Sequence, residues 1–97
     1  MENFSRVLCE MEQLYSAKNN DYGNSFTKSF EKYGLISPLI RLEDKLNRLE
    51  SLVLNCSQEV EDESIRDTLI DLANYAAMTL VELDKKSEKE RKAKYNI

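Results

Sequence analysis

The spacing of apolar residues constrains this chain more than any other feature. Over much of its 97 residues they recur every three or four positions, which is the repeat of a helix that buries one side. One proline and two glycines are the only residues of their kind in the sequence, so little in it breaks a helix. The pattern predicts an all-α fold.

Three main helices are predicted, joined through a turn-rich loop. The first covers about residues 3–17. The second begins with Ser37 as its N-cap and Pro38 in its first position, where both residue types are favoured. The third begins at Glu61 or Asp62, where acidic side chains favour the helix dipole, and extends to about residue 86 or beyond.

The periodicity fails between the first two helices. Residues 19–24 are rich in Asn, Asp and Gly, which tolerate left-handed backbone and make turns, so a loop is predicted there. The aromatic residues that follow repeat at helical spacing and indicate one short packed face, made by Phe26, Phe30 and Tyr33. Gly34 should end this short helix.

Each later helix carries an apolar stripe that should face the core. The stripe of the second helix consists of Leu39, Leu42, Leu46, Leu49 and Val53. The stripe of the third consists of Ile65, Leu69, Leu72, Ala73, Ala76, Leu80 and Leu83, widened by Ile70, Ala77 and Val81. Because this arc is wide and a chain of 97 residues has a small core, we expect a homodimer or homotetramer.

Composition excludes several classes of function. The net charge of −4 argues against a protein that coats nucleic acid. The chain has two cysteines and no histidine, so a Cys/His zinc site is excluded and any metal would be a hard cation held by carboxylates. No membrane span or signal peptide is expected, and we predict a cytoplasmic protein with free thiols. Residues 1–84 should form one helical domain, and the charged residues 85–97 should fray.

Three segments of the sequence are rich in polar residues that helix formation does not require. The first segment contains Lys18, Asp21, Tyr22, Asn24, Ser25 and Phe26. The second contains Arg41, Asp44, Lys45 and Arg48. The third contains Asp67, Asp71, Asn74 and Tyr75. Cations on one helix and carboxylates on another suit a ligand that carries phosphates, with or without a metal ion.

Each segment also has an ordinary structural interpretation. The aromatic residues of the first segment could stack on a base or could simply pin the loop to the core. Arg41 and Arg48 could grip phosphate oxygens, or they could form a surface salt-bridge ladder with Asp44. Asp67 and Asp71 lie one helical turn apart, so they could converge on Mg²⁺ or form a solvated acidic face.

Four motifs occur in a fixed order: KNNDYGNSF, KYGLIS, RLEDKLNRL and ESIRDTLIDLANYA. Together they resemble the nucleotide-modification-associated domain 1 family over roughly residues 18–83. The resemblance implies relatives in phages and Firmicutes and a distant similarity to MazG-like all-α nucleotide pyrophosphohydrolases. It therefore implies a MazG-like helical bundle completed by oligomerisation, with the three polar segments as a nucleotide site.

The chain departs from those hydrolases in its acidic residues. They hold Mg²⁺ on a Glu-x-x-Glu and a following Glu-x-x-Asp, but this sequence contains no Glu-x-x-Glu. Glu59-x-x-Asp62 matches the second motif in letters, although its place at a helix start is typical of capping. The metal ligands of an enzyme would then be Asp44, Asp67 and Asp71, among cations that compete for them.

Three functions remain open. The first is the binding of a phosphorylated nucleotide or nucleotide-derived signal, with no cofactor, by a phage protein that sequesters a defence signal or serves modified-nucleotide metabolism. The second is a Mg²⁺-dependent nucleotide pyrophosphohydrolase, for which the sequence assigns no catalytic residue. For either function the expected location is the cytoplasm of a bacterial cell. The third is a structural helical assembly protein.

Overall fold

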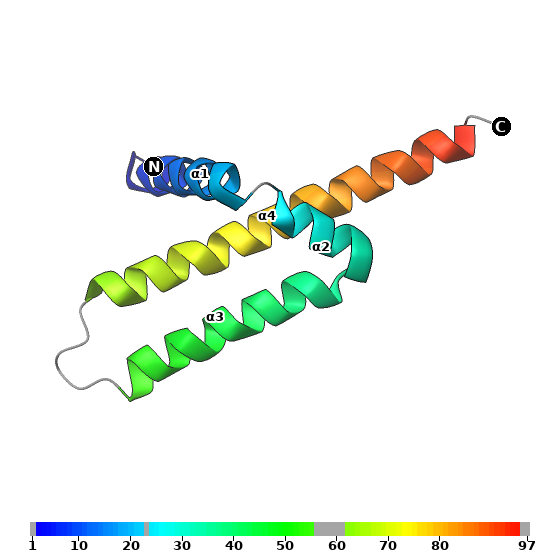
Figure 1. Ribbon diagram of the computed structural model, residues 1–97. Helices are drawn as coiled ribbons and strands as arrows, with labels where there is room; N and C mark the ends of the chain where they lie inside the picture. The colour runs from blue at the N-terminus through cyan, green and yellow to red at the C-terminus, as the bar shows by residue number, and fades with distance from the viewer. Residues whose placement is uncertain (1, 23, 56–61, 96–97) are drawn as a thin grey trace.

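The structure is a computed structural model that describes residues 2–22, 24–55 and 62–95, and it leaves out the side chains of residues 20–22, 62, 63 and 95. Within these ranges the elements are α1 (Glu2–Tyr22), α2 (Ser25–Tyr33), α3 (Ile36–Leu54) and α4 (Asp62–Tyr95) (Figure 1). The described residues include no strand. The all-α prediction is confirmed.

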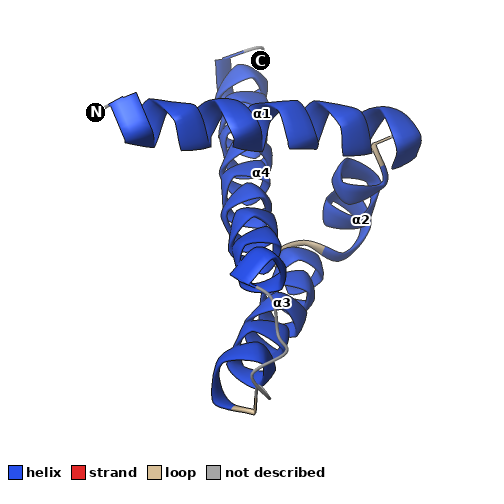
Figure 2. Cartoon of the chain, turned by 90° about the vertical axis from the view of Figure 1, so that its left-hand side faces the viewer, coloured by secondary structure: helices blue, strands red, loops and turns tan. Residues whose placement is uncertain are grey.

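α3 and α4 form a long antiparallel pair, and α2 packs against the start of α3 (Figure 1). α1 crosses α4 on another side and contacts it less closely (Figure 2). The radius of gyration is 16.4 Å, whereas a compact chain of this length would have about 12–13 Å. The single chain is therefore elongated, and the last turns of α4 extend beyond the other helices.

α1 is longer than predicted. It ends at Tyr22, so most of the predicted loop is helical. The low helix propensity of Asn and Asp costs only a few tenths of a kcal/mol per residue, and tertiary contacts override it. Such a contact is the ion pair that Lys18 makes with Asp71 of α4. The turn itself is confined to the region of Asn24, whose left-handed backbone (φ 63°) leads into α2.

α3 begins one residue before the predicted N-cap. Leu35 holds the N-cap position without a side-chain hydrogen bond, so Ser37 lies inside the first turn. The prediction of a Ser37 cap is wrong because α2 ends at Gly34 (φ 70°) and the chain turns directly into α3. Pro38 still lies in the first turn, where its missing N–H is not needed, and it is fully buried.

The core of the single chain is small. Its buried apolar side chains in the described residues are Phe26, Phe30, Pro38 and Ile70. Packing of Phe26 and Phe30 is thus confirmed. Tyr33, expected to pack beside Phe30, is 60% exposed at the end of α2, with the ammonium of Lys32 5.3 Å from its ring centroid.

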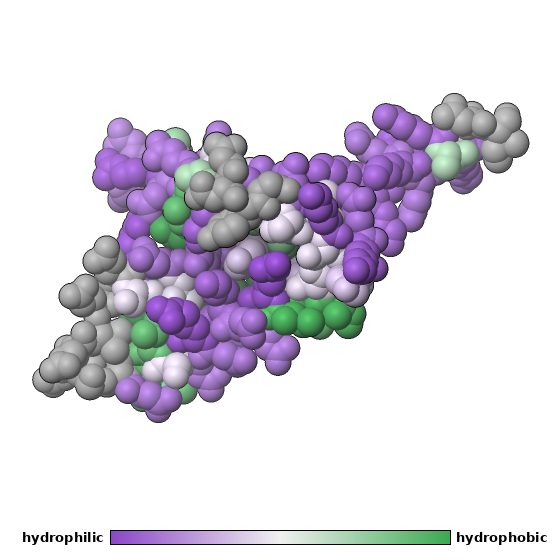
Figure 3. All heavy atoms as spheres, viewed as in Figure 1, coloured by the Kyte–Doolittle hydropathy of each residue, from purple (hydrophilic) through white to green (hydrophobic). Residues whose placement is uncertain are grey.

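The predicted apolar stripes are only partly covered. On α4, Leu69, Ala76 and Leu80 are exposed, whereas their neighbours Thr68 and Ile70 are buried. The side of α4 that α1–α3 cover is therefore turned away from the predicted stripe. On α3, the exposed members of the stripe are Leu39, Leu46 and Val53. Figure 3 shows apolar side chains at the surface along α3.

Polar bonds join α1 and α2 to α4. Arg66 of α4 donates a hydrogen bond to Glu10 of α1, and this hydrogen bond and the charge of Glu10 raise the pKa of the Arg66 guanidinium. Asn74 donates its side-chain N–H to the backbone oxygen of Met11 at 3.2 Å. Thr27 of α2 donates a hydrogen bond from its hydroxyl to the carboxylate of Glu82 on α4 at 2.6 Å. These bonds fix how α1 and α2 lie against α4.

Two sequence expectations concern cysteine and the membrane. Cys9 is an exposed free thiol, as predicted, and Cys56 lies outside the described residues. In the part of the chain that the structure describes, no helix has both the length and the apolar character that crossing a membrane requires.

Candidate functional site

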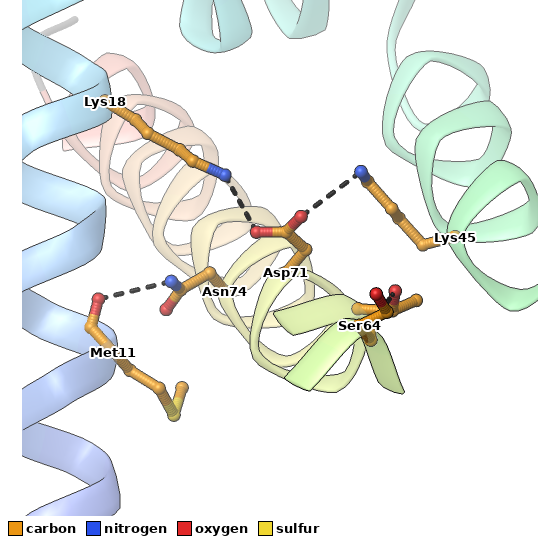
Figure 4. A network of polar contacts seen from close by, with 7 residues as sticks. Met11, Lys18, Lys45, Ser64, Asp71 and Asn74 are labelled. Atoms are coloured by element: carbon orange, nitrogen blue, oxygen red, sulfur yellow. Dashed lines mark hydrogen bonds and ion pairs between the residues drawn. The ribbon is translucent and has the colours of Figure 1, made fainter. Parts of the chain in front are cut away.

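Asp71 is the centre of a polar network between three helices (Figure 4). Its side chain is 17% exposed, and its two oxygens face two different ammonium groups. Lys18 of α1 donates a hydrogen bond to Oδ1 at 2.8 Å, and Lys45 of α3 pairs with Oδ2 at 3.2 Å. One carboxylate of α4 therefore positions cations from α1 and α3.

The two lysines determine the ionisation of Asp71. Burial raises the pKa of this carboxyl, but the hydrogen bonds and charges of Lys18 and Lys45 together outweigh it, so the pKa lies below its ordinary value. Asp71 is therefore a carboxylate at neutral pH. The cluster as a whole has two cations for one anion, which leaves a positive excess for a further anion.

An aromatic pair stands beside this cluster. Tyr75, one turn after Asp71 on α4, stacks on Phe26 of α2 with ring centroids 6.0 Å apart and an interplanar angle of 22°. The guanidinium of Arg41 on α3 lies 5.9 Å from the centroid of the Tyr75 ring, which is within the range of a cation–π interaction. This contact places a third cation next to Lys45.

These side chains line a cavity of about 470 Å³ among the four helices, which we call the cationic cavity. Its lining residues are Tyr15, Lys18, Asn19, Ser25, Phe26, Arg41, Lys45, Asp71, Asn74, Tyr75 and Met78. Its size suits a small-molecule ligand. Its lining combines three cations, one carboxylate and several aromatic rings, so it can bind an anion that also has a flat apolar part.

The structure brings together members of all three polar segments of the sequence. The candidates that line the cationic cavity are Lys18, Ser25, Phe26, Arg41, Lys45, Asp71, Asn74 and Tyr75. They come from the last turns of α1, the start of α2, the first half of α3 and the middle of α4. Helices that are distant in sequence therefore supply a single cavity.

Other candidates lie elsewhere. Those that do not line the cationic cavity are Asn24, Asp44, Arg48 and Asp67, and all four are exposed. Arg48 is on nearly the same side of α3 as Arg41, but seven residues later, which is about 10 Å along the axis. The side chains of Asp21 and Tyr22 lie outside the described residues.

The predicted metal ligands do not come together. Asp44 and Asp67 are exposed, and Asp71 faces two ammonium groups. Among the described residues there is no group of three or more Asp, Glu, Cys or His side chains that could hold a metal ion. A divalent cation carries the same sign as the ammonium groups and would have to displace them. The described side chains therefore do not fit a resident Mg²⁺.

Sequence reasoning missed three lining residues. Tyr15 falls within the first predicted helix, where no site residue was expected, and Asn19 falls within the predicted loop. Met78 is the case with a usable signal, because the spacing of Asp71, Asn74 and Met78 places all three on one side of a helix. Because residues 19–24 were predicted to form a loop, Asn19 was not placed on the first helix. In the structure it follows Tyr15 by one helical turn.

A second cavity of about 250 Å³ adjoins the first, and we call it the apolar cavity. Both cavities are lined by Tyr15, Asn19, Phe26, Asn74 and Met78, which form a shared wall. The other lining residues of the apolar cavity are Leu8, Met11, Glu12, Thr27, Ala77, Val81 and Glu82. The two cavities thus differ in charge and are separated by side chains alone.

One family model matches the part of the sequence that contains most of the site residues. The model of the family described as nucleotide modification associated domain 1 matches residues 18–83, which is more than half of the chain. This range contains every lining residue of the cationic cavity except Tyr15. The searches of curated proteins and of solved structures each gave no match.

Proposed function

The chain belongs to the nucleotide modification associated domain 1 family, and from this premise we propose that the cationic cavity binds a phosphorylated nucleotide. The observation that carries the proposal is the convergence of Lys18, Arg41 and Lys45 on one cavity that contains a single carboxylate. Ammonium and guanidinium groups are the usual partners of phosphate oxygens. The stacked rings of Phe26 and Tyr75 supply a flat surface for the rest of the nucleotide.

Asp71 prepares the cavity for phosphate. It holds both ammonium groups at its two oxygens, so less side-chain freedom is lost when a ligand binds. The ammonium of Lys45 has three N–H donors and pairs with Asp71 through Oδ2, which leaves donors for phosphate oxygens. A phosphate group can therefore join the cluster without removing Asp71 from it.

We propose binding without hydrolysis. The carboxylates that would hold Mg²⁺ in a pyrophosphohydrolase are dispersed, and Asp71 is already paired with lysines. A ligand that is held only by direct charge contacts is not hydrolysed, and it is released chemically intact. In a cell, such a protein would sequester a nucleotide or a nucleotide-derived signal. This activity suits a phage protein that acts against a nucleotide-based defence, or one that serves modified-nucleotide metabolism.

Titration calorimetry with nucleoside triphosphates and inorganic tripolyphosphate tests the proposed function. Each probe should be titrated with Mg²⁺ and with EDTA, and the nucleotide should be analysed after the saturated complex is denatured. We expect binding in EDTA and recovery of intact nucleotide. Multiple turnovers that depend on Mg²⁺ would establish the pyrophosphohydrolase instead. The absence of binding by every phosphorylated probe would overturn the proposal and favour a structural role.

We also propose that the protein works as a homodimer or homotetramer. Leu69, Ala76 and Leu80 form an exposed apolar row on one side of α4, and the elongated single chain buries few apolar residues. A second copy packed on this row would complete a helical bundle of the MazG-like kind. Light scattering should show an oligomer that Leu80→Lys converts to monomer and that Glu90→Lys leaves intact. A monomeric wild type at micromolar concentration would refute the proposal.

A further inference from the structure

The apolar cavity contains a carboxylate that phosphate binding does not use. Glu82 of α4 is buried, with its side chain only 7% exposed. It lines the apolar cavity together with apolar side chains such as Met11 and Val81. Burial of a charged group is costly unless the group is paired, so a residue of this kind in a core needs an explanation.

Both partners of Glu82 contact the same oxygen. Thr27 donates its hydroxyl to Oε1 at 2.6 Å, and the ammonium of Lys85 lies 3.2 Å from the same atom. Within the described part of the chain, Oε2 makes no hydrogen bond or ion pair. No fully buried side-chain oxygen or nitrogen there lacks a partner. Oε2 is therefore accessible to solvent in a residue that lines the apolar cavity, so it can accept a hydrogen bond from a ligand.

Glu82 and Asp71 lie on nearly the same side of α4. They are eleven residues apart, which corresponds to about 20° around the helix and about 16 Å along its axis. The two cavities, which share a wall, therefore follow one side of this helix. Cations gather at the Asp71 end, whereas the Glu82 end is mainly apolar and has two carboxylates, the buried Glu82 and the exposed Glu12. An extended nucleotide has the same order, from phosphates through sugar to base.

Taking the proposed function as its basis, we propose that the apolar cavity is the base subsite and that Glu82 selects guanine. The remaining oxygen, Oε2, has lone pairs for two donors, so it suits a base that presents two adjacent N–H groups to one acceptor. Guanine does so with N1–H and its N2 amino group. Adenine places an acceptor at N1 and cytosine an acceptor at N3, which the carboxylate repels. Uracil offers a single N–H between two carbonyl groups.

The neighbouring side chains suit this role. Phe26 in the shared wall offers a ring face, and Met11 and Met78 offer flexible apolar surface for the faces of a purine. Thr27 and Lys85 hold Glu82 at Oε1 and leave Oε2 directed to the ligand. If Glu82 only joined α2 to α4, the bond to Thr27 would suffice and base identity would have no effect on affinity.

Competition between GTP, ITP and ATP on the wild-type protein tests the inference without any substitution. ITP has N1–H but lacks the N2 amino group, so we expect affinity to fall from GTP to ITP to ATP. The difference between GTP and ATP should be about tenfold or more. Inorganic tripolyphosphate, which has no base, should bind more weakly than GTP but still measurably.

Two substitutions link this preference to Glu82. Glu82→Gln keeps an acceptor for Thr27 and offers an amide that can pair with adenine, so the GTP preference should disappear or reverse. Glu82→Asp keeps the charge, but its shorter side chain holds the carboxylate farther from the base, so the preference for GTP should shrink. Tripolyphosphate should bind both variants as it binds the wild type. Glu88→Gln, a matched change at an exposed position of α4, should alter none of these affinities.

The outcomes separate this inference from the proposed function. If all nucleotides and tripolyphosphate bind equally well, the base subsite is wrong and phosphate binding stands. If the wild-type preference survives both substitutions, another group reads the base. If no phosphorylated probe binds, the proposed function fails and the base subsite fails with it.

Discussion

Two carboxylates of α4 meet their partners in opposite ways. Asp71 uses both of its oxygens, one for Lys18 and one for Lys45, and so connects three helices. Glu82 lines the apolar cavity and receives both of its partners at one oxygen, and its other oxygen makes no hydrogen bond or ion pair within the described residues. Asp71 therefore positions cations, whereas Glu82 has an oxygen left that can accept a hydrogen bond from a ligand. Both carboxylates are charged and largely buried, so their roles differ because of how the donors are distributed between the two oxygens. A carboxylate with both oxygens paired positions its partners, and one with a single oxygen paired can also bind a ligand.

The largest test of this difference removes the cations that Asp71 positions. The double substitution Lys18→Ala/Lys45→Ala should weaken tripolyphosphate binding by more than about 100-fold, because hydrogen bonds to charged groups contribute about 1.5–3 kcal/mol each. Titration calorimetry at fixed low salt measures the loss. The double substitution Lys28→Ala/Lys32→Ala removes equal charge from exposed positions of α2 and should cost only a few-fold. Equal losses in the two variants would mean that overall charge, and not the cationic cavity, attracts phosphate.

A second test defines the end of the cationic cavity on α3. Arg41→Ala should weaken nucleotide binding about tenfold or more, since Arg41 lines the cavity beside Tyr75. Arg48→Ala should change affinity about twofold or less and unfolding free energy by about 0.5 kcal/mol or less, since Arg48 is exposed beyond the cavity. Equal weakening by both substitutions would extend the site along α3, as the sequence pattern predicted.

The smallest expected effect concerns stability and pH. The pKa of Asp71 is lowered in the folded protein, so its stabilising contribution is present above the ordinary carboxyl pKa of about 4 and is lost as pH falls through the folded value. Asp71→Asn should therefore lower the unfolding free energy by about 1 kcal/mol or less at pH 7. Urea unfolding at a series of pH values should show this difference shrinking in acid.

The matched control for pH is Glu10→Gln, which breaks the exposed pair with Arg66. It should reduce stability less than Asp71→Asn does, because solvent screens exposed charges more strongly. A difference between wild type and Asp71→Asn that stays constant into strong acid would show that the two lysines do not control the ionisation of Asp71.

Much of the fold could be predicted from the sequence, because helices follow directly from apolar periodicity. The ends of helices were less predictable. α1 continues through Asn19 to Tyr22 because contacts with α4 outweigh weak propensities. The covered side of α4 also differed from the widest apolar stripe, which leaves Leu69 and Leu80 exposed in one chain. Apolar periodicity alone does not distinguish the side of a helix that packs within the chain from an apolar side that stays exposed.

The site was partly predictable for the same reason. The sequence indicated cations on the second helix and carboxylates on the third. Which of them share a cavity depends on their position along each axis, so Arg41 and Asp71 line it while Arg48 and Asp67 do not. Glu82 carried no signal, because a charged residue between Val81 and Leu83 is read as solvent-exposed until the contact with α2 is known.

The polar attachment of α1 makes this helix a reporter of occupancy. α1 reaches α4 through the bonds of Glu10, the backbone oxygen of Met11 and Lys18, and Lys18 is also a proposed ligand contact. A phosphate that bridges Lys18 and Lys45 would clamp α1 to α3 as well as to α4. By thermodynamic linkage, whatever holds α1 in place then also strengthens ligand binding, and by the same factor. Proteolytic cleavage within α1 would consequently slow as the cavity fills, while added salt would loosen the helix and empty the cavity together.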